Sequence, residues 1–174
     1  IWTSDNGAPR RSPPQGLNSP LGGWGYSTAE GGMRVPCIMR WPERIPAGTV
    51  CDQLCTTMDM LPTFASLAGT EVPSSPPIDG LDIRSLLMDH GAASPHQAFY
   101  YYFLEQLQAV RVGDWKLYLA YKSRTRDGNT VTAKQRLYDI RKDPGETNNV
   151  VKLHADRTED GVEGKGLELG GGRS

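Results

Sequence analysis

The amino-acid sequence predicts an α/β fold that ends in a small antiparallel sheet. The extended apolar opening Ile1-Trp2-Thr3 runs directly into Ser4-Asp5-Asn6-Gly7, as a strand does when it presents polar groups at a sheet edge. Apolar residues recur at helical spacing across residues 58–68. Between residues 98 and 140, short aromatic and aliphatic runs alternate with turn signals, which favours several antiparallel strands.

Composition sets wide bounds on function. The chain of 174 residues can hold one or two domains with a hydrophobic core. Its formal net charge of −1 gives no reason to expect a nucleic-acid partner or an anionic membrane surface. No apolar run approaches the roughly 18–20 residues that a membrane-spanning helix needs. The three cysteines, an odd number, are expected to be buried free thiols.

Asp5 and Asn6 are the candidate metal ligands. One carboxylate and one amide oxygen form a hard donor pair that suits calcium or magnesium better than zinc. Gly7 then lets the backbone turn without a Cβ clash. An Asp-Asn-Gly run is also an ordinary turn former, because Asn and Asp bond to their own backbone. The spacing by itself leaves both interpretations open.

The remaining elements follow in order. Proline and glycine make residues 8–26 an irregular loop, and residues 35–41 then form a short apolar strand that suits a sheet buried on both faces. Thr56-Thr57 caps a helix over 58–68, and a short helix covers 83–88. Strands are expected at 98–103, 107–112, 115–121 and 135–140, with a tight turn at Gly113-Asp114 and a polar loop at 122–132. Residues 158–174 read as disordered.

Several motifs occur in a fixed order along residues 1–150. They are Thr3-Ser4-Asp5-Asn6-Gly7, Pro20-Leu21-Gly22-Gly23, Glu30-Gly31-Gly32-Met33-Arg34-Val35-Pro36, Arg40-Trp41-Pro42, Asp59-Met60-Leu61-Pro62-Thr63-Phe64, Asp79-Gly80-Leu81-Asp82, Gly113-Asp114-Trp115-Lys116-Leu117 and Asp143-Pro144-Gly145-Glu146-Thr147-Asn148-Asn149. Together they resemble the second half of a type I sulfatase of the arylsulfatase family. The resemblance implies a partial alkaline-phosphatase-like sulfatase fold. Residues 1–95 would be the carboxy-terminal part of the catalytic domain, 96–150 a small antiparallel-sheet subdomain, and 151–174 a disordered or aberrant tail.

The resemblance also implies a function. Members of this family are sulfuric ester hydrolases with one divalent metal, usually calcium, and the carry-over makes Asp5 and Asn6 two of its ligands. The expected substrate is a sulfate-ester small molecule or glycan. A secreted, periplasmic or lysosomal location is compatible with the family, and the oligomeric state is undefined.

The family's nucleophile has no counterpart in this chain. That nucleophile is a formylglycine made from cysteine in a Cys-x-Pro-x-Arg signature, and Cys37, Cys51 and Cys55 all lack the signature. We therefore expect a fragment whose amino-terminal half, with the formylglycine, is missing, and which is inactive alone. No catalytic residue is assigned, and the substrate-binding residues are unknown.

Anion binding departs from the family pattern as well. Gly25 stands where the family usually carries a sulfate-binding lysine, five residues before Glu30. Arg10 and Arg11 could supply positive charge, although solvated loop arginines are the simpler interpretation. His90, His96 and His154 are all expected at the surface.

Two other functions remain open from the sequence. A phosphatase or phosphonate hydrolase of the same superfamily would use a similar metal clamp on a tetrahedral ester. A non-catalytic fragment that binds a partner through its antiparallel sheet belongs to a different class.

Overall fold

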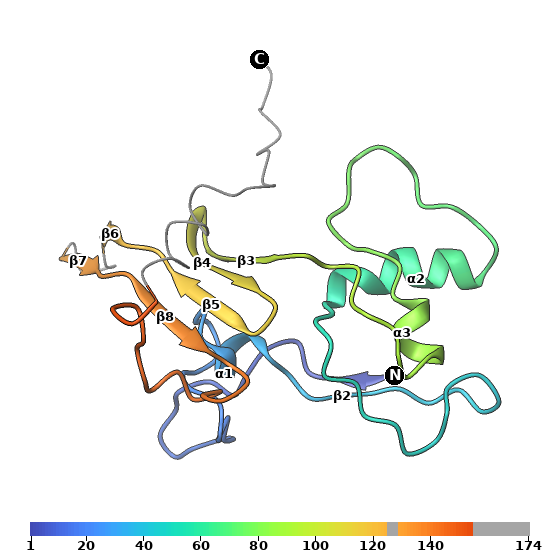
Figure 1. The fold of residues 1–174 in the computed structure, drawn as a ribbon, viewed down its shortest axis with the longest axis horizontal. Helices are drawn as coiled ribbons and strands as arrows, with labels where there is room; N and C mark the ends of the chain where they lie inside the picture. The colour runs from blue at the N-terminus through green and yellow to red at the C-terminus, as the bar shows by residue number, and fades with distance from the viewer. Residues whose placement is uncertain (125–128, 155–174) are drawn as a thin grey trace. The chain divides into compact units, whose positions relative to one another are not determined.

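The computed structural model describes residues 1–124 and 129–154, which contain three antiparallel sheets (Figure 1). Contacts divide the chain into two compact units. Unit 1 contains residues 1–3 and 37–97, and unit 2 contains residues 4–36 together with the described residues from 98 onward. The domain boundaries drawn from the sequence remain predictions, and the predicted disordered tail at 158–174 lies outside the described residues.

A four-stranded antiparallel sheet forms the centre of unit 2. Its strands are β3 (Phe99–Phe103), β4 (Gln106–Val112), β5 (Trp115–Tyr118) and β8 (Arg136–Asp139), in the order β3-β4-β5-β8. Aromatic and β-branched side chains pack well on a pleated, half-buried surface, which explains why these runs form strands. Gly113, with φ +56°, makes the predicted tight turn between β4 and β5. The small antiparallel sheet is therefore confirmed.

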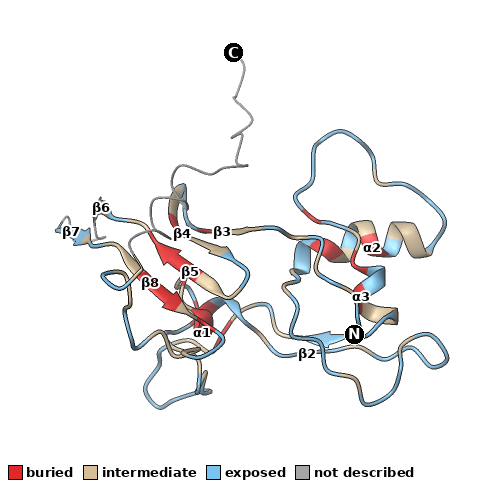
Figure 2. Cartoon of the chain, in the orientation of Figure 1, coloured by how far each residue is buried: buried red, intermediate tan, exposed pale blue. Residues whose placement is uncertain are grey.

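The core of unit 2 lies on this sheet. Figure 2 shows the buried stretches along β4, β5 and β8. The central cluster contains Tyr101, Ala109, Tyr118, Tyr138 and Ile140. The ring of Phe99 meets that of Tyr101 edge-on at a centroid distance of 4.8 Å, an arrangement that aromatic pairs prefer.

A separate hairpin replaces the polar loop predicted at 122–132. Strand β5 ends at Tyr118, and β6 (Tyr121–Arg124) pairs antiparallel with β7 (Thr130–Ala133). The prediction of one strand over 115–121 followed by a loop is therefore wrong. The β-branched run Thr130-Val131-Thr132 favours extended backbone even though its residues are exposed and mostly polar.

Unit 1 contains the predicted helices. The 3-10 turn η1 (Thr57–Asp59) leads into α2 (Met60–Leu67), and α3 (Arg84–Met88) follows, which confirms the helices expected at 58–68 and 83–88. None of the helices in the described ranges is both long and apolar enough to span a membrane.

The strand expected at 35–41 is shorter and more exposed than predicted. Strand β2 covers only Cys37–Ile38 and pairs with β1 (Trp2–Thr3), and the Ile38 side chain is 63% exposed. Burial on both faces is therefore wrong for this strand, which forms only a two-residue ladder in the described structure. Cys37, Cys51 and Cys55 are free but exposed, so the prediction of buried thiols is also wrong.

Asp59 organises the start of α2. Its carboxylate is fully buried and accepts hydrogen bonds from Thr56 N at 2.6 Å and Leu81 N at 2.8 Å. His96 Nε2 lies 2.8 Å from the same carboxylate, with its side chain only 7% exposed. The prediction of a surface His96 is wrong, because Asp59 provides a buried partner far away in sequence.

Replacing this carboxylate should destabilise unit 1. In Asp59→Ala, Thr56 N, Leu81 N and His96 lose their shared acceptor, and buried polar groups without partners are costly. We expect the free energy of unfolding to fall by about 3 kcal/mol, measured by urea unfolding. The matched control is Asp52→Ala at an exposed position, which should leave stability nearly unchanged. Equal losses in the two variants would contradict the role of Asp59.

Candidate metal centre

The segment with the predicted metal ligands is held in place by backbone hydrogen bonds within unit 2. Gly7 N donates to Gly32 O at 3.0 Å, next to the short helix α1 (Glu30–Met33). Ala8 is bound on both sides by the Asn18 side chain, whose Oδ1 accepts from Ala8 N at 2.7 Å and whose Nδ2 donates to Ala8 O at 3.0 Å. The Asp5–Ala8 stretch is thus packed against Glu30-Gly31-Gly32, hereafter the glycine-rich turn.

Asp5 and Asn6 lie together at a bend of the chain directly before Gly7. Asp5 is exposed, and its Oδ1 accepts from Asn6 N at 2.9 Å. Asn6 Nδ2 donates to Gly7 O at 2.7 Å, which directs Oδ1 to the opposite side of the amide. Within the described ranges, no group of three or more His, Cys, Asp and Glu side chains could hold a metal ion. Within the described residues, the candidate site therefore consists of two adjacent oxygen donors, Asp5 and Asn6.

Glycine is required at both ends of this contact. A Cβ on Gly7 would overlap Gly31 O, and a Cβ on Gly25 would overlap Gly7 O and lie 3.0 Å from Asn6 Nδ2. Gly25 N also donates to Ala8 O at 3.0 Å. A lysine at position 25 would not fit this arrangement, which gives a physical reason for the departure from the family pattern.

A buried charge cluster lies behind the glycine-rich turn. The Lys116 side chain is fully buried on β5, and its Nζ lies 2.9 Å from Glu30 Oε1 and 3.0 Å from Glu146 Oε1. Lys116 Nζ also donates to Thr28 O at 2.7 Å. Glu146 Oε2 accepts from Glu30 N at 2.8 Å. Three charged side chains from distant parts of the sequence therefore satisfy one another out of water.

Two tyrosines complete the charge cluster. Tyr101 OH donates to Glu30 Oε1 at 3.2 Å, and Tyr118 OH donates to Glu146 Oε1 at 2.7 Å. Burial raises the pKa of both hydroxyls, and the adjoining glutamate charges raise it further. Both tyrosines therefore act as neutral donors. The Lys116 ammonium also lies 4.1 Å from the Tyr101 ring centroid, a cation–π contact.

Sequence reasoning missed this charge cluster. The partners of Glu30 lie 71, 86 and 116 residues away along the chain, so no local pattern of residues indicates them. The available signal was a lysine within the otherwise apolar run of β5, Trp115 to Tyr118.

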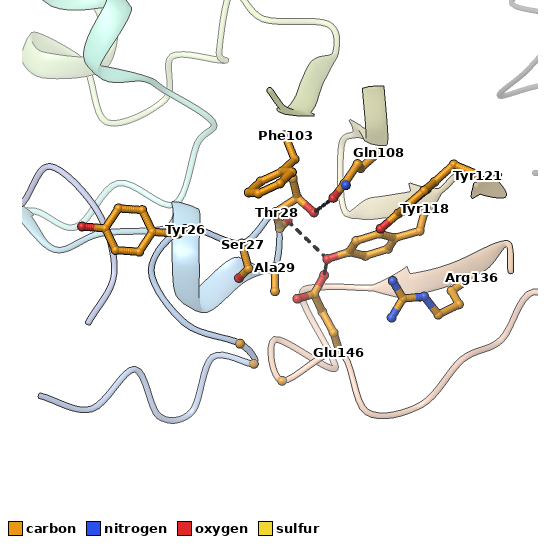
Figure 3. Close-up of a pocket in the computed structure, with 13 residues that line it drawn as sticks. Tyr26, Ser27, Thr28, Ala29, Phe103, Gln108, Tyr118, Tyr121, Arg136 and Glu146 are labelled. Atoms are coloured by element: carbon orange, nitrogen blue, oxygen red, sulfur yellow. Dashed lines mark hydrogen bonds between the residues drawn. The ribbon is translucent and has the colours of Figure 1, made fainter. Parts of the chain in front are cut away.

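A partly open cavity of about 450 Å³ adjoins the charge cluster. Figure 3 shows its wall of Thr28, Tyr118 and Glu146, joined by hydrogen bonds, with Arg136 beside the Tyr118 ring. The Arg136 guanidinium carbon lies 4.2 Å from the centroid of that ring. Tyr26 also lines the cavity, yet its side chain is 76% exposed.

The loop arginines considered for anion binding, Arg10 and Arg11, are both exposed. Among the described residues, neither arginine forms an ion pair or a hydrogen bond with Asp5 or Asn6.

Comparisons with known proteins agree on one family. The family described as "N-sulphoglucosamine sulphohydrolase, C-terminal" matches residues 26–160. The chain is 43% identical over 118 residues to N-acetylgalactosamine-6-sulfatase of Canis lupus familiaris, which covers 67% of this chain and 22% of the relative. It is 35% identical over 169 residues to arylsulfatase A of Homo sapiens, which covers 87% of this chain and 33% of the relative.

Solved structures give the same result. The PsFucS1 sulfatase from Pseudoalteromonas sp. superposes with a TM-score of 0.73 at 25% identity, over 92% of this chain and 36% of that one. A structure described as BT4656 "in complex with its substrate D-Glucosamine-2-N, 6-O-disulfate" superposes with a TM-score of 0.58 at 25% identity, over 77% of this chain and 28% of that one. The chain thus spans about a fifth to a third of the curated relatives named above.

Gly7 offers a direct test of the packing around the ligands. In Gly7→Ala the new methyl group overlaps Gly31 O, and overpacking against backbone costs about 2 kcal/mol of unfolding free energy. Thermal and urea unfolding measure the loss. Gly91→Ala is the control, since its nearest contact is the end of a side chain at 3.5 Å. An unchanged free energy of unfolding in Gly7→Ala would show that Gly7 is not packed against Gly31 O in this way.

The loop that carries Glu146 should depend on pH through Asp143. Burial opposes ionisation of this carboxylate, but hydrogen bonds from Asn148 N and Thr147 outweigh that effect and lower its pKa. The resulting stabilisation is present above the ordinary carboxyl pKa and is lost as the pH falls through the lowered value. Carboxyl NMR should show Asp143 titrating at a lower pH than an ordinary aspartate. In Asp143→Asn, the pH-dependent stabilisation that this carboxylate provides should be absent from the free energy of unfolding. A pKa of Asp143 at or above that of an ordinary aspartate would refute this prediction.

Proposed function

The chain belongs to the sulfatase family and matches the carboxy-terminal region of its members, and from this premise we propose that it contributes metal ligands to a sulfuric ester hydrolase. The observation that supports this proposal is the hydrogen-bonded bend at Asp5 and Asn6, which lies beside the glycine-rich turn. The proposed substrate is a sulfate-ester small molecule or glycan. The nucleophile, a formylglycine, and the remaining ligands would come from sequence that this chain does not contain.

The donor set fits a hard divalent cation, and calcium is the proposed ion. Asp5 is exposed, and the amide orientation of Asn6 leaves its Oδ1 without a hydrogen bond among the described residues. Carboxylate and amide oxygens are ligands that calcium accepts in flexible geometry. A calcium ion held there would balance charge on the sulfate oxygens of the substrate.

Within this proposal, residues next to Asp5 and Asn6 in the chain hold and orient the two metal ligands. Asn6 Nδ2 donates a hydrogen bond to Gly7 O, so the Asn6 side chain is already oriented when a cation binds. Ser4 Oγ donates to Asn6 O at 2.9 Å and braces the same bend. A preorganised ligand loses less freedom on binding, so these local bonds favour cation capture. Two ligands alone give weak binding, and the chain by itself is proposed to be inactive.

Cation binding tests the ligand assignment. Titration of the full chain with calcium should shift the amide NMR signals of Asp5, Asn6 and Gly7, with a dissociation constant of about 1 mM or weaker. Asp5→Ala and Asn6→Ala should abolish the shifts. Asp89→Ala is the matched control, because Asp89 Oδ1 also accepts a local backbone hydrogen bond, from Gly91 N. Unchanged shifts in Asp5→Ala would refute the assignment.

Activity separates the competing functions. The chain alone should not hydrolyse an aryl sulfate, whereas arylsulfatase A with its matching region replaced by this chain should do so in a calcium-dependent way that Asp5→Ala removes. If the chimera hydrolyses an aryl phosphate faster than the aryl sulfate, a phosphatase would be favoured. A well-folded chain that binds no calcium and yields a chimera insensitive to Asp5→Ala would favour a non-catalytic binding fragment.

A further inference from the structure

We propose that Glu146, with Lys116 and Glu30, is a positioning residue that holds the glycine-rich turn against Asp5–Gly7 and so sets how well the chain binds a divalent cation. The cation part rests on the proposed function. The mechanical part rests only on contacts within unit 2 and can be tested without a metal.

Glu146 anchors the glycine-rich turn to the sheet. Glu146 Oε2 accepts the backbone N–H of Glu30, the first residue of α1, at 2.8 Å. Its other oxygen, Oε1, accepts from Tyr118 OH at 2.7 Å and lies 3.0 Å from Lys116 Nζ. Glu146 therefore uses both oxygens as acceptors, one toward the sheet and one toward the turn. It links β5 to the start of α1 through a single side chain.

The glycine-rich turn is bonded to Asp5–Gly7, the ligand segment. One turn of backbone separates Glu30 N from Gly32 O, and Gly32 O accepts from Gly7 N at 3.0 Å. Gly31 N is fixed in addition by Gly22 O at 2.6 Å. Because a Cβ on Gly7 would overlap Gly31 O, the two segments are in backbone contact with no side chain to absorb a shift. A displacement of α1 must therefore move Asp5 and Asn6 or break the contact.

The buried charge of Lys116 holds the two segments together. Lys116 is fully buried, so its ammonium needs partners in place of water. Two carboxylates, Glu30 and Glu146, meet it from two separate segments, and Thr28 O accepts a further hydrogen bond at 2.7 Å. The ammonium thus pulls the loop with Glu146 and the turn with Glu30 onto the same point of the sheet.

The two glutamates offer a matched pair of variants. Glu146→Gln replaces one acceptor oxygen with an NH₂ donor, so the amide cannot serve both Glu30 N and the Lys116–Tyr118 side. Glu30→Gln removes the same charge, yet Glu30 Oε1 alone accepts from Lys116 Nζ and Tyr101 OH, and a Gln oxygen can keep both bonds. Whichever way its amide points, only Glu146→Gln breaks the link between the sheet and the turn.

The mechanical test is amide hydrogen exchange on the full chain without metal. Glu146→Gln should speed exchange at Gly7 and Gly31 about tenfold, and Glu30→Gln less than about twofold. The amides of Leu119 and Ile140, bonded to Gln108 O and Asp114 O, serve as internal references in the sheet and should change little. A uniform rise at all four amides, or equal effects of the two variants, would overturn the positioning role.

The cation test uses the calcium titration of the same proteins. Glu146→Gln should weaken the calcium affinity about fivefold, while Glu30→Gln leaves it within about twofold, because the ligand segment moves only in the first. Equal affinities in the wild-type chain and Glu146→Gln would overturn the coupling to the cation. If the wild-type chain itself shows no calcium shifts at Asp5 and Asn6, the proposed function fails in its metal part, and hydrogen exchange alone decides the positioning role.

Discussion

Two glutamates from distant segments share one buried ammonium group, and the arrangement of unit 2 depends on that constraint. Lys116 projects from the central strand β5, while Glu30 opens α1 and Glu146 lies in the loop after β8. An ion buried to this extent is tolerable only with partners in good geometry. The ammonium therefore dictates where both segments must lie, with a directionality that apolar packing lacks.

The tyrosines convert this constraint into a unique arrangement. Each carboxylate has one tyrosine donor, and burial keeps both hydroxyls protonated as their pKa values rise. A fully satisfied polar network inside a core selects one geometry, because any slip leaves a group without a partner. The glycines at positions 7 and 25 then let the ligand segment approach the turn at backbone distance.

Much of this could be predicted from sequence, and the failures have physical causes. The strands β3, β4 and β5 and the helix α2 follow from local sequence patterns, and the Gly113 turn from its dihedral freedom. The charge cluster did not follow, because its pairings join residues 28 to 116 positions apart and no local pattern encodes them. His96 was misplaced for the same reason, since its partner Asp59 lies 37 residues earlier.

The exposed β2 illustrates a second kind of failure. The apolar composition of residues 35–41 predicts burial on both faces, but Ile38 has only β1 as a strand neighbour in the described structure. Composition reports what a segment could bury, whereas exposure depends on what is present to cover it.

The wide spacing of the charge cluster also bears on the order of folding. The β4–β5 hairpin closes over a two-residue turn, whereas the bond from Glu30 N to Glu146 must bring together residues 116 positions apart. Closing such a loop costs more chain entropy than closing a hairpin, so non-local contacts form slowly. We therefore expect the sheet to form as an early nucleus and the segment bearing Asp5 and Asn6 to acquire its shape only late in folding.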